Sequence, residues 1–594
     1  MAVQDGVTDG YISFDAGQNE GSIPALIAEN QTHRNINVTL RNRAARPRPP
    51  LIDIDVEFVS EELRLARPLA GSLTYEHNFL FGRIQHSGKY QNPQGEFLIQ
   101  VINGIIYISD LIRQNVRVVE VAGTQKLLNY NLTRINGEQS ENEYVLHDWP
   151  NNPVTVTSDF TAFRSSSINQ GIPKSYIGTH VHDRLAVGNS GIEFGLSDSR
   201  KANPGPVITF KESIPASNNP NPPYPNQFFK LNYIDKLSSI TAMGFLHQSD
   251  GTSPLGFGPL FVSTKEAIHL VAVNQPRSQW QATQSFVRVV VYNYGIIGPR
   301  AFVNVGQDLF YKSFDGHIYT MSLMASDQLK WGVTHISAEV ADSLITRNQH
   351  LLKYADMAYL RNRIFVTLKP YIVQALNLFG LAIEDYVSNG MGVLEVNNIS
   401  GLAGNSSPVW AGIYSGTITN ILEIGDRLIV IGKRNEKNTI SYLSEFRTLD
   451  YAMGVSKKIR SRIYTREFVF KAPLQDKKVK YVQLDVRNIL GKFVAHVYYR
   501  TKEEKSWKKF GSVYYKPEDS LKRGSISEES ICAQDGAVTL GRGIQFRIDI
   551  VGEDWELIRF IATGEVYTDI KYERKYDAPF PLTEEFDAVG DMDL

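Results

Sequence analysis

The chain has 594 residues, a formal net charge of -1, 42% hydrophobic residues, and 29 each of Tyr and Phe. Its length predicts two to four domains of about 150 residues each, or one large propeller with appended segments. The balanced charge disfavours binding of nucleic acid through a general basic excess, and the single cysteine, Cys532, excludes an intramolecular disulfide.

Membrane insertion and secretion are not expected. The sequence has no run of about 18 apolar residues, so we expect no membrane-spanning helix. The start, Met1–Gly6, lacks a charged residue followed by an apolar segment, so no signal peptide is expected.

Residues 1–55 are expected to form an N-terminal arm. Apolar residues follow no regular period there, and the segment ends in the arginine- and proline-rich run Arg41–Pro50. Because proline fixes φ and lacks an N–H, this run should be extended and unable to lie in the centre of a sheet. Its arginines leave two interpretations open, a plain surface arm or an arm that contacts a partner chain or phosphates.

Residues 56–165 are expected to form a strand-rich platform region with room for the first blade of a propeller. Within it, Gly95–Ile102 and Ile105–Ile108 read as strands on either side of Asn103-Gly104. Asn-Gly supplies the positive φ values of a type I′ turn, so this segment predicts a β-hairpin.

One sequence pattern recurs along residues 166–455. It consists of a polar or Gly/Asp turn followed by a run of β-branched and aromatic residues. Recurrence of such a strand unit at about 50–75 residues predicts a β-propeller, here with roughly six blades. The count stays open, because the first spacings are wide enough to hide a blade or an inserted domain. The copies are Asp183–Gly188, Gly258–Ser263, Gln307–Lys312, Asn362–Thr367 and Gly425–Val430.

Other local signals fall inside the same region. Asp315-Gly316 predicts a second hairpin, and the Pro- and Asn-rich runs 203–206 and 218–225 predict loops. Ser337–Ile345 has the clearest helical spacing, with Ser337 as the expected N-cap of a helix of two or three turns.

A boundary is expected near residues 455–475, followed by a C-terminal β-sandwich over residues 456–578. Apolar and polar residues alternate there, as in an antiparallel sheet with one wet face. Residues 579–594 form an acidic tail with little to bury. The expected strands are Tyr481–Val486, Phe493–Arg500, Trp507–Val513, Ile544–Ile550 and Ile558–Ala562.

The sequence contains none of the common catalytic or nucleotide-binding motifs, and we expect no enzyme activity, cofactor or metal. His180 and His182 would share one face of a strand, but two further ligands are not identifiable. An alternative class stays open, a glycan-binding or glycan-cleaving propeller, which needs a pair of carboxylates at the central channel. A generic propeller that binds partner proteins as a monomer is a third hypothesis.

Short motifs follow one another in a fixed order along most of residues 10–470. They are Phe14–Gly17, Asn30-Gln31, Asn35, Asn37-Val38, Arg46-Pro47, Asp183–Leu185, Leu196–Ser199, Gly298–Gly306, Leu309–Tyr311, Asp315–Tyr319 and Ser461–Arg466. In this order they resemble the tail nozzle proteins of short-tailed bacteriophages, also called tail tubular protein B or tail stabilisation protein. One position departs from that pattern, because Arg48 stands where the family has glycine after Arg-Pro.

The resemblance implies a structural protein of the virion tail, assembled in the host cytoplasm. Nozzle proteins form a ring, generally of six copies, that closes the distal end of a short tail, continues the DNA channel and gates genome ejection. The implied partners are other copies of the chain, the portal adaptor or head–tail connector, double-stranded DNA in transit and, as an open alternative, tail fibres. The residues expected at the subunit or adaptor interface are Arg34, Asn35, Asn37, Arg41, Arg43, Arg46 and Pro47.

Overall fold

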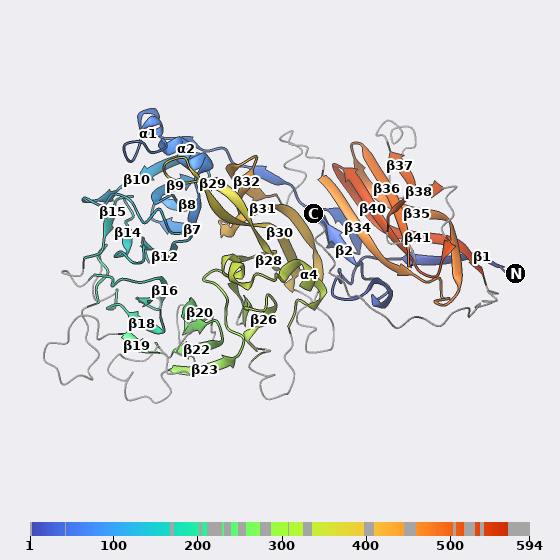
Figure 1. Ribbon diagram of the computed structural model, residues 1–594, viewed down its shortest axis with the longest axis horizontal. Helices are drawn as coiled ribbons and strands as arrows, with labels where there is room; N and C mark the ends of the chain where they lie inside the picture. Colours follow the sequence, from blue (N-terminus) through green and yellow to red (C-terminus); the bar gives the residue numbers. More distant parts are fainter. Residues whose placement is uncertain are drawn as a thin grey trace, which may run out of the picture.

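The computed structural model is almost entirely β-structure and has two lobes side by side (Figure 1). The chain enters through the smaller lobe, runs through the larger one, and returns to the smaller one. No helix in the described ranges is long and apolar enough to cross a membrane. The structure describes residues 3–41, 43–166, 171–189, 191–200, 205–210, 228–230, 239–247, 257–271, 273, 287–306, 308–322, 324, 335–396, 409–444, 459–502, 506–515, 529–534 and 540–567.

The larger lobe is built of successive antiparallel meanders, which we number blades 1 to 7 within the described residues. Blade 1 contains β7 (Ile84–Asn92), β8 (Gly95–Ile102), β9 (Ile105–Asp110), β10 (Asn115–Val119) and the parallel β6 (Glu57–Phe58). Blade 2 contains β12 (Asn136–Ser140), β13 (Glu143–His147), β14 (Val154–Val156), β15 (Ala162–Arg164) and the parallel β11 (Val121–Ala122). Residues 56–165 therefore form two blades.

The next three blades are separate sheets. Blade 3 contains β16 (Ile177–Val181), β17 (Arg184–Gly188), β18 (Glu193–Leu196) and β19 (Phe228–Lys230). Blade 4 contains β20 (Ile240–His247), β21 (Phe257–Thr264), β22 (Ala267–Val271) and β23 (Val287–Tyr292). Blade 5 contains β24 (Phe302–Val305), β25 (Asp308–Lys312) and β26 (Ile318–Thr320).

Blades 6 and 7 share the long strand β31 (Trp410–Ile424), which pairs over part of its length with another long strand, β30 (Ala382–Glu395). Blade 6 contains β27 (Met357–Leu360), β28 (Arg363–Thr367) and the adjoining halves of β30 and β31. Blade 7 contains the rest of β31, then β32 (Arg427–Arg434), β33 (Lys437–Leu443) and β5 (Leu51–Asp53). The strand β29 (Pro370–Leu376) pairs with the first half of β30. The last blade is thus completed by a strand from the N-terminal arm.

The blades close into a β-propeller, and the expected fold class is confirmed. Their innermost strands contact one another in chain order, except that β20 of blade 4 contacts β25 of blade 5, and β31 of blade 7 contacts β7 of blade 1. Separate buried apolar clusters fill each interface between neighbouring blades. Val145 packs with Leu185 between blades 2 and 3, and Ile84 packs with Leu422 between blades 1 and 7. Burial of apolar side chains between blades is what holds such a ring together.

The repeated pattern of the sequence corresponds to one strand in each of five blades. Its five copies fall on β17, β21, β25, β28 and β32, which are the second strands of blades 3 to 7. These strands lie in the middle of their sheets and are buried, for example Leu185 and Phe365 at 0% exposure. A strand that is buried on both faces reads as a continuous apolar run, which explains why this strand gave the clearest signal.

Local predictions in the propeller have mixed outcomes. Asn103 and Gly104 have φ of 46° and 79° between β8 and β9, so the type I′ hairpin is confirmed. The second hairpin, β25 to β26, is also confirmed. Ser337 is wrong as a helix cap, because its hydroxyl accepts from the N–H of Ile318 instead. Residues 203–204, the loop 218–225 and the acidic tail 579–594 lie outside the described residues.

Five short helices of the described residues belong to the propeller segments of the chain, and they are α1 (Glu61–Leu65), α2 (Tyr75–Phe81), η3 (Ala338–Val340), α4 (Ala341–Leu344) and η4 (Gln349–Tyr354). The 3₁₀ turn η1 (Pro24–Leu26) belongs to the N-terminal arm and contacts β34 of the smaller lobe. The helix predicted over 337–345 is therefore a 3₁₀ turn followed by a single α-helical turn.

The smaller lobe is the expected β-sandwich. One sheet contains β1 (Val3–Tyr11), β3 (Val38–Arg41), β4 (Ala44–Pro47), β41 (Asp554–Tyr567), β35 (Asp476–Leu490), β38 (Glu529–Gln534) and β39 (Leu540–Gly541). The other contains β34 (Ile459–Phe468), β40 (Ile544–Gly552), β36 (Phe493–Thr501) and β37 (Lys508–Tyr515). Between them lies an aromatic core, in which the rings of Phe546 and Phe560 are 5.4 Å apart. All five predicted strands are present.

Candidate functional site

The histidine pair singled out in the sequence does not form a site. His180 lies in β16, and its Nδ1 is 3.2 Å from the Ser140 hydroxyl. His182 has φ of 54°, so it belongs to the turn after β16 and the alternation expected on one strand face is wrong. Across the described ranges, no three His, Cys, Asp or Glu side chains are grouped to hold a metal ion.

The N-terminal arm joins the two lobes through β2 (Arg34–Ile36). Ile36 pairs with Ile413 of the propeller on one side and with Arg462 of the sandwich on the other. A sheet of the sandwich therefore continues into blade 6 (Figure 1). Residues 34–36 contain no proline, so their N–H groups are free to pair on both sides.

The proline-containing part of the arm also lies inside a sheet, so the expectation that it could not is wrong. The strand β4 lies between β3 and β41. Pro47 is its last residue, and the pairing with β41 is limited to Ala45 and Leu557. No ladder hydrogen bond toward β41 is therefore required from the proline.

Asn35 and Asn37 of the predicted interface set make contacts within the chain. Asn35 is fully buried, and its Nδ2 donates to the Thr32 hydroxyl at 2.6 Å. Asn37 has φ of 57°, and its Nδ2 donates to the Ser415 hydroxyl at 2.8 Å and to the Arg460 carbonyl at 3.0 Å. Asn37 thus ties the propeller to the sandwich at the same joint.

The arginines of the set divide into internal and exposed groups. Arg46 pairs with Glu556 at 2.5 Å, and Arg487 shares that carboxylate at 2.6 Å. Arg34 is 3.8 Å from Glu20 and is 42% exposed, whereas Arg43 is 81% exposed with Asp15 at 4.0 Å. Two members of the set remain. Pro47 is buried, and the backbone of Arg41 at the end of β3 pairs with Ala44 at the start of β4. Among the members whose side chains the structure describes, Arg43 is therefore the most accessible, and Arg34 is accessible in part.

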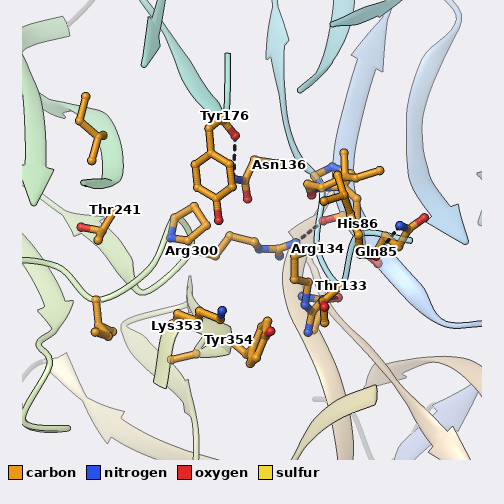
Figure 2. A pocket seen from close by; sticks show the side chains of 18 of the residues that line it. Gln85, His86, Thr133, Arg134, Asn136, Tyr176, Thr241, Arg300, Lys353 and Tyr354 are labelled. Carbon is orange, nitrogen blue, oxygen red and sulfur yellow. Dashed lines mark hydrogen bonds between the residues drawn. The ribbon is translucent and has the colours of Figure 1, made fainter. Parts of the chain in front are cut away.

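A second candidate site lies on the propeller axis, where the innermost strands of all blades meet. A cavity of about 420 Å³ opens there, and Figure 2 shows the side chains that project into it. Its lining comes from the starts of the innermost strands or the segments that enter them. The labelled lining residues are Gln85, His86, Thr133, Arg134, Asn136, Tyr176, Thr241, Arg300, Lys353 and Tyr354.

Arg300 fixes three blades around this cavity. Its guanidinium pairs with the buried Asp356 at 3.1 Å and donates to the carbonyl oxygens of Ser87 and Ile421. Asp356 also accepts from the N–H of Ile421 at 2.9 Å. Burial, opposed by the Arg300 charge, raises the pKa of Asp356 above its usual value. This pair is complete within the protein and serves the fold.

His86 is neutral in the cavity wall. Its Nε2 is 2.8 Å from the Tyr144 hydroxyl and its Nδ1 is 3.1 Å from the Ile135 carbonyl. Burial, together with the nearby Arg300 charge, lowers the pKa of His86 to about 3. The positive charge of the cavity therefore comes from arginine and lysine alone.

Sequence reasoning missed this site, because its residues are far apart in the chain. A signal was present nonetheless. Arg134, Arg300 and Lys353 each stand two to four residues before the innermost strand of their own blade, at β12, β24 and β27. Equivalent positions in a radial repeat converge on the axis, so a cation recurring at this point predicts an axial cluster.

No family model matches the chain, and no curated protein matches it. Among solved structures it is similar to BamB from Moraxella catarrhalis, with 11% identity over 67% of this chain and 98% of that one, at a TM-score of 0.33. It is also similar to the C-terminal WD40 domain of Sif2, with 8% identity over 74% and 98% and a TM-score of 0.35. A third is apo AztD from Citrobacter koseri, with 13% identity over 59% and 76% and a TM-score of 0.31.

Proposed function

We propose that this protein is a structural component of the virion, the tail nozzle of a short-tailed bacteriophage. Copies of the chain, six by the resemblance, would form a closed cyclic ring at the distal end of the tail. That ring would continue the DNA channel below the adaptor and gate genome ejection. Head-to-tail contacts between identical subunits close into a ring when the rotation between neighbours fits a whole number of copies.

The observation that carries this proposal is the joint between the lobes. The strand β2 belongs to a sheet that spans blade 6 and the sandwich, and Asn37 adds hydrogen bonds to both sides. Two β-lobes joined by continuous sheet resist bending, which suits the wall of a channel that passes DNA under pressure. The short motifs that follow one another in a fixed order between residues 10 and 470 support the same assignment.

The near-zero net charge also fits a channel wall. Each lysine or arginine that pairs with a phosphate adds salt-dependent affinity, which would slow DNA in transit. A chain with 62 basic and 63 acidic residues carries no general excess of either sign.

Antibodies against the purified chain test this proposal directly. Immunogold labelling of particles from the phage that encodes the chain should place gold at the distal tip of the short tail. Label on the capsid, or absence of the chain from purified particles, would refute the nozzle role. Pre-immune serum on the same grids is the control.

A further inference from the structure

The axial cavity has more positive charge than the protein itself neutralises. Its lining includes Arg134, Arg300 and Lys353, and no Asp or Glu stands among the described residues that line it. Arg300 is balanced by Asp356, as described above. The charges of Arg134 and Lys353 remain to be accounted for.

Arg134 makes only neutral contacts. Its guanidinium donates to the Asn420 side-chain oxygen at 3.2 Å and to the Thr419 carbonyl at 3.5 Å. No carboxylate within the described residues lies in ion-pair distance of it. The carboxylate that acts on it most strongly, Asp385, is itself paired with Lys433 at 2.8 Å. Keeping a cation this enclosed without a direct counter-charge is costly.

Lys353 and Arg134 both lie close to the aromatic ring of Tyr354. The Lys353 Nζ is 5.1 Å and the Arg134 guanidinium carbon 5.4 Å from the ring centre of Tyr354. Tyr354 in turn stacks on Tyr386 with centres 4.4 Å apart, which fixes its position. In Figure 2, Lys353 and Tyr354 lie on one side of the cavity and Tyr176 on the other. Two like charges held together attract a common anion.

A second observation concerns Ser87, another residue of the cavity wall. Ser87 lines the cavity and is fully buried, yet its hydroxyl has no hydrogen-bond partner. A buried hydroxyl without a partner costs free energy that a bound acceptor would recover. The described residues that line the cavity thus include a guanidinium and an ammonium without a direct counter-charge, and a hydroxyl without a hydrogen-bond partner.

We propose that the axial cavity binds a small phosphate-bearing anion through Arg134, Lys353 and the hydroxyl of Ser87. Phosphate offers several acceptor oxygens on one compact centre, which matches donors that come from different directions. The cavity volume of about 420 Å³ lies within the range of about 300–1,000 Å³ that is usual for small-molecule sites. This site is independent of the proposed role in the tail.

Calorimetric titration of the full-length chain in phosphate-free buffer tests the proposal, with inorganic phosphate, pyrophosphate and adenosine 5′-monophosphate as separate probes. We expect saturable binding of one molecule per chain by at least one probe. Tighter binding of the ester would identify an organic phosphate as the ligand class, and tighter binding of inorganic phosphate or pyrophosphate would identify the free ion. Absence of saturable binding by all three would overturn the proposal.

Variants assign the site. Lys353→Gln and Ser87→Ala should each weaken binding, Lys353→Gln by tenfold or more, with unchanged circular dichroism and unfolding temperature. Lys126→Gln, at a lysine that is 60% exposed and pairs with Glu120, is the matched control and should bind like the unmodified chain. Arg134→Gln should also weaken binding. If it fails to fold, Lys353→Gln decides, since Lys353 makes no side-chain hydrogen bond or ion pair within the described residues. Wild-type affinity in both Lys353→Gln and Ser87→Ala would place any binding elsewhere and contradict the assignment.

Discussion

At the scale of single residues, buried charges hold the N-terminal strand in place. Asp9 of β1 pairs with Arg466 at 2.5 Å, and its other oxygen accepts from the N–H groups of Val469 and Phe470 at 2.8 Å each. Asp5 lies on the same strand, but it is 64% exposed and bonded only to groups at the surface. The two aspartates therefore form a matched pair that differs in burial.

Asp9→Ala should lower the free energy of unfolding by about 3–5 kcal/mol, because it leaves Arg466 buried without its partner and strands two N–H groups. Asp5→Ala should change stability little, since exposed ion pairs contribute little. Urea unfolding of both variants measures the difference. Equal destabilisation by the two substitutions would show that burial of the Asp9 pair is not what matters.

Burial of the Lys312 ammonium should make the stability of the folded protein depend on pH. It is fully buried in β25, where its Nζ is 3.4 Å from the Thr367 carbonyl, and burial lowers its pKa to about 7 from 10.5. Between pH 7 and 10.5 the unfolded chain binds the extra proton, so stability rises with pH across this window. Below pH 7 both states carry the proton and this contribution is flat.

Lys312→Met should therefore stabilise the protein at pH 7, on the order of 4 kcal/mol, and the gain should shrink toward pH 10. Thermal unfolding at pH 7, 8.5 and 10 measures it. Lys126→Met, at an exposed site, is the control and should show no such trend. A gain that is constant with pH would mean that packing, rather than the charge, is responsible.

At the scale of elements, the turn between β8 and β9 requires glycine for two reasons. Gly104 has φ of 79°, and a Cβ there would lie 2.5 Å from the carbonyl oxygen of Leu128. Gly71 has a similar φ of 76°, but a Cβ there would meet nothing within 4 Å. The pair separates backbone strain from steric overlap.

Gly104→Ala should destabilise blade 1 by at least about 2 kcal/mol, since strain and overlap act together. Gly71→Ala should cost about 1 kcal/mol, from strain alone. Chemical denaturation of both variants checks this order. A larger loss at Gly71 would contradict the role of the Leu128 contact.

The same elements show how far the sequence predicts the structure. Signals within one strand or turn were reliable, as at Asn103-Gly104 and in the alternation of Phe493–Arg500, because local geometry determines them. Pairings between distant segments were not predictable. The arm strand β2 lies between residues 413 and 463, and β5 completes a blade with partners almost 400 residues away. The sequence around Ser337 predicts a helix cap, but the hydroxyl of Ser337 accepts a hydrogen bond from the N–H of Ile318 in β26 instead.

The candidate sites follow the same division. The segment from Arg34 to Pro47 is predicted as an interface because it is rich in arginine, asparagine and proline. That composition could not tell that Asn35 and Pro47 are buried, or that Arg46 pairs with Glu556. The cations of the axial cavity were missed because Arg134 and Lys353 meet only when the ring closes.

At the scale of the whole molecule, the exposed part of the N-terminal arm is the place to test for a contact with a neighbouring copy of the chain. Arg43 is 81% exposed with only Asp15 nearby at 4.0 Å, so Arg43→Glu should leave the unfolding temperature unchanged. In the proposed ring it should reduce incorporation of the chain into tails at least tenfold, measured by quantitative mass spectrometry of purified particles. Lys126→Glu, at an exposed position on the propeller, is the control. Normal incorporation of Arg43→Glu would remove this part of the arm from the subunit interface.

The central proposal is that the propeller and the sandwich together form one segment of a ring wall. A cryo-electron microscopy reconstruction of the tail, from particles of the short-tailed phage proposed to carry this chain, tests it most directly. We expect six copies in a closed ring at the distal end of the tail, each with its propeller and sandwich joined through β2 as in the single chain. Density for this chain elsewhere in the particle, or a tail tip built without it, would contradict its role as a ring wall.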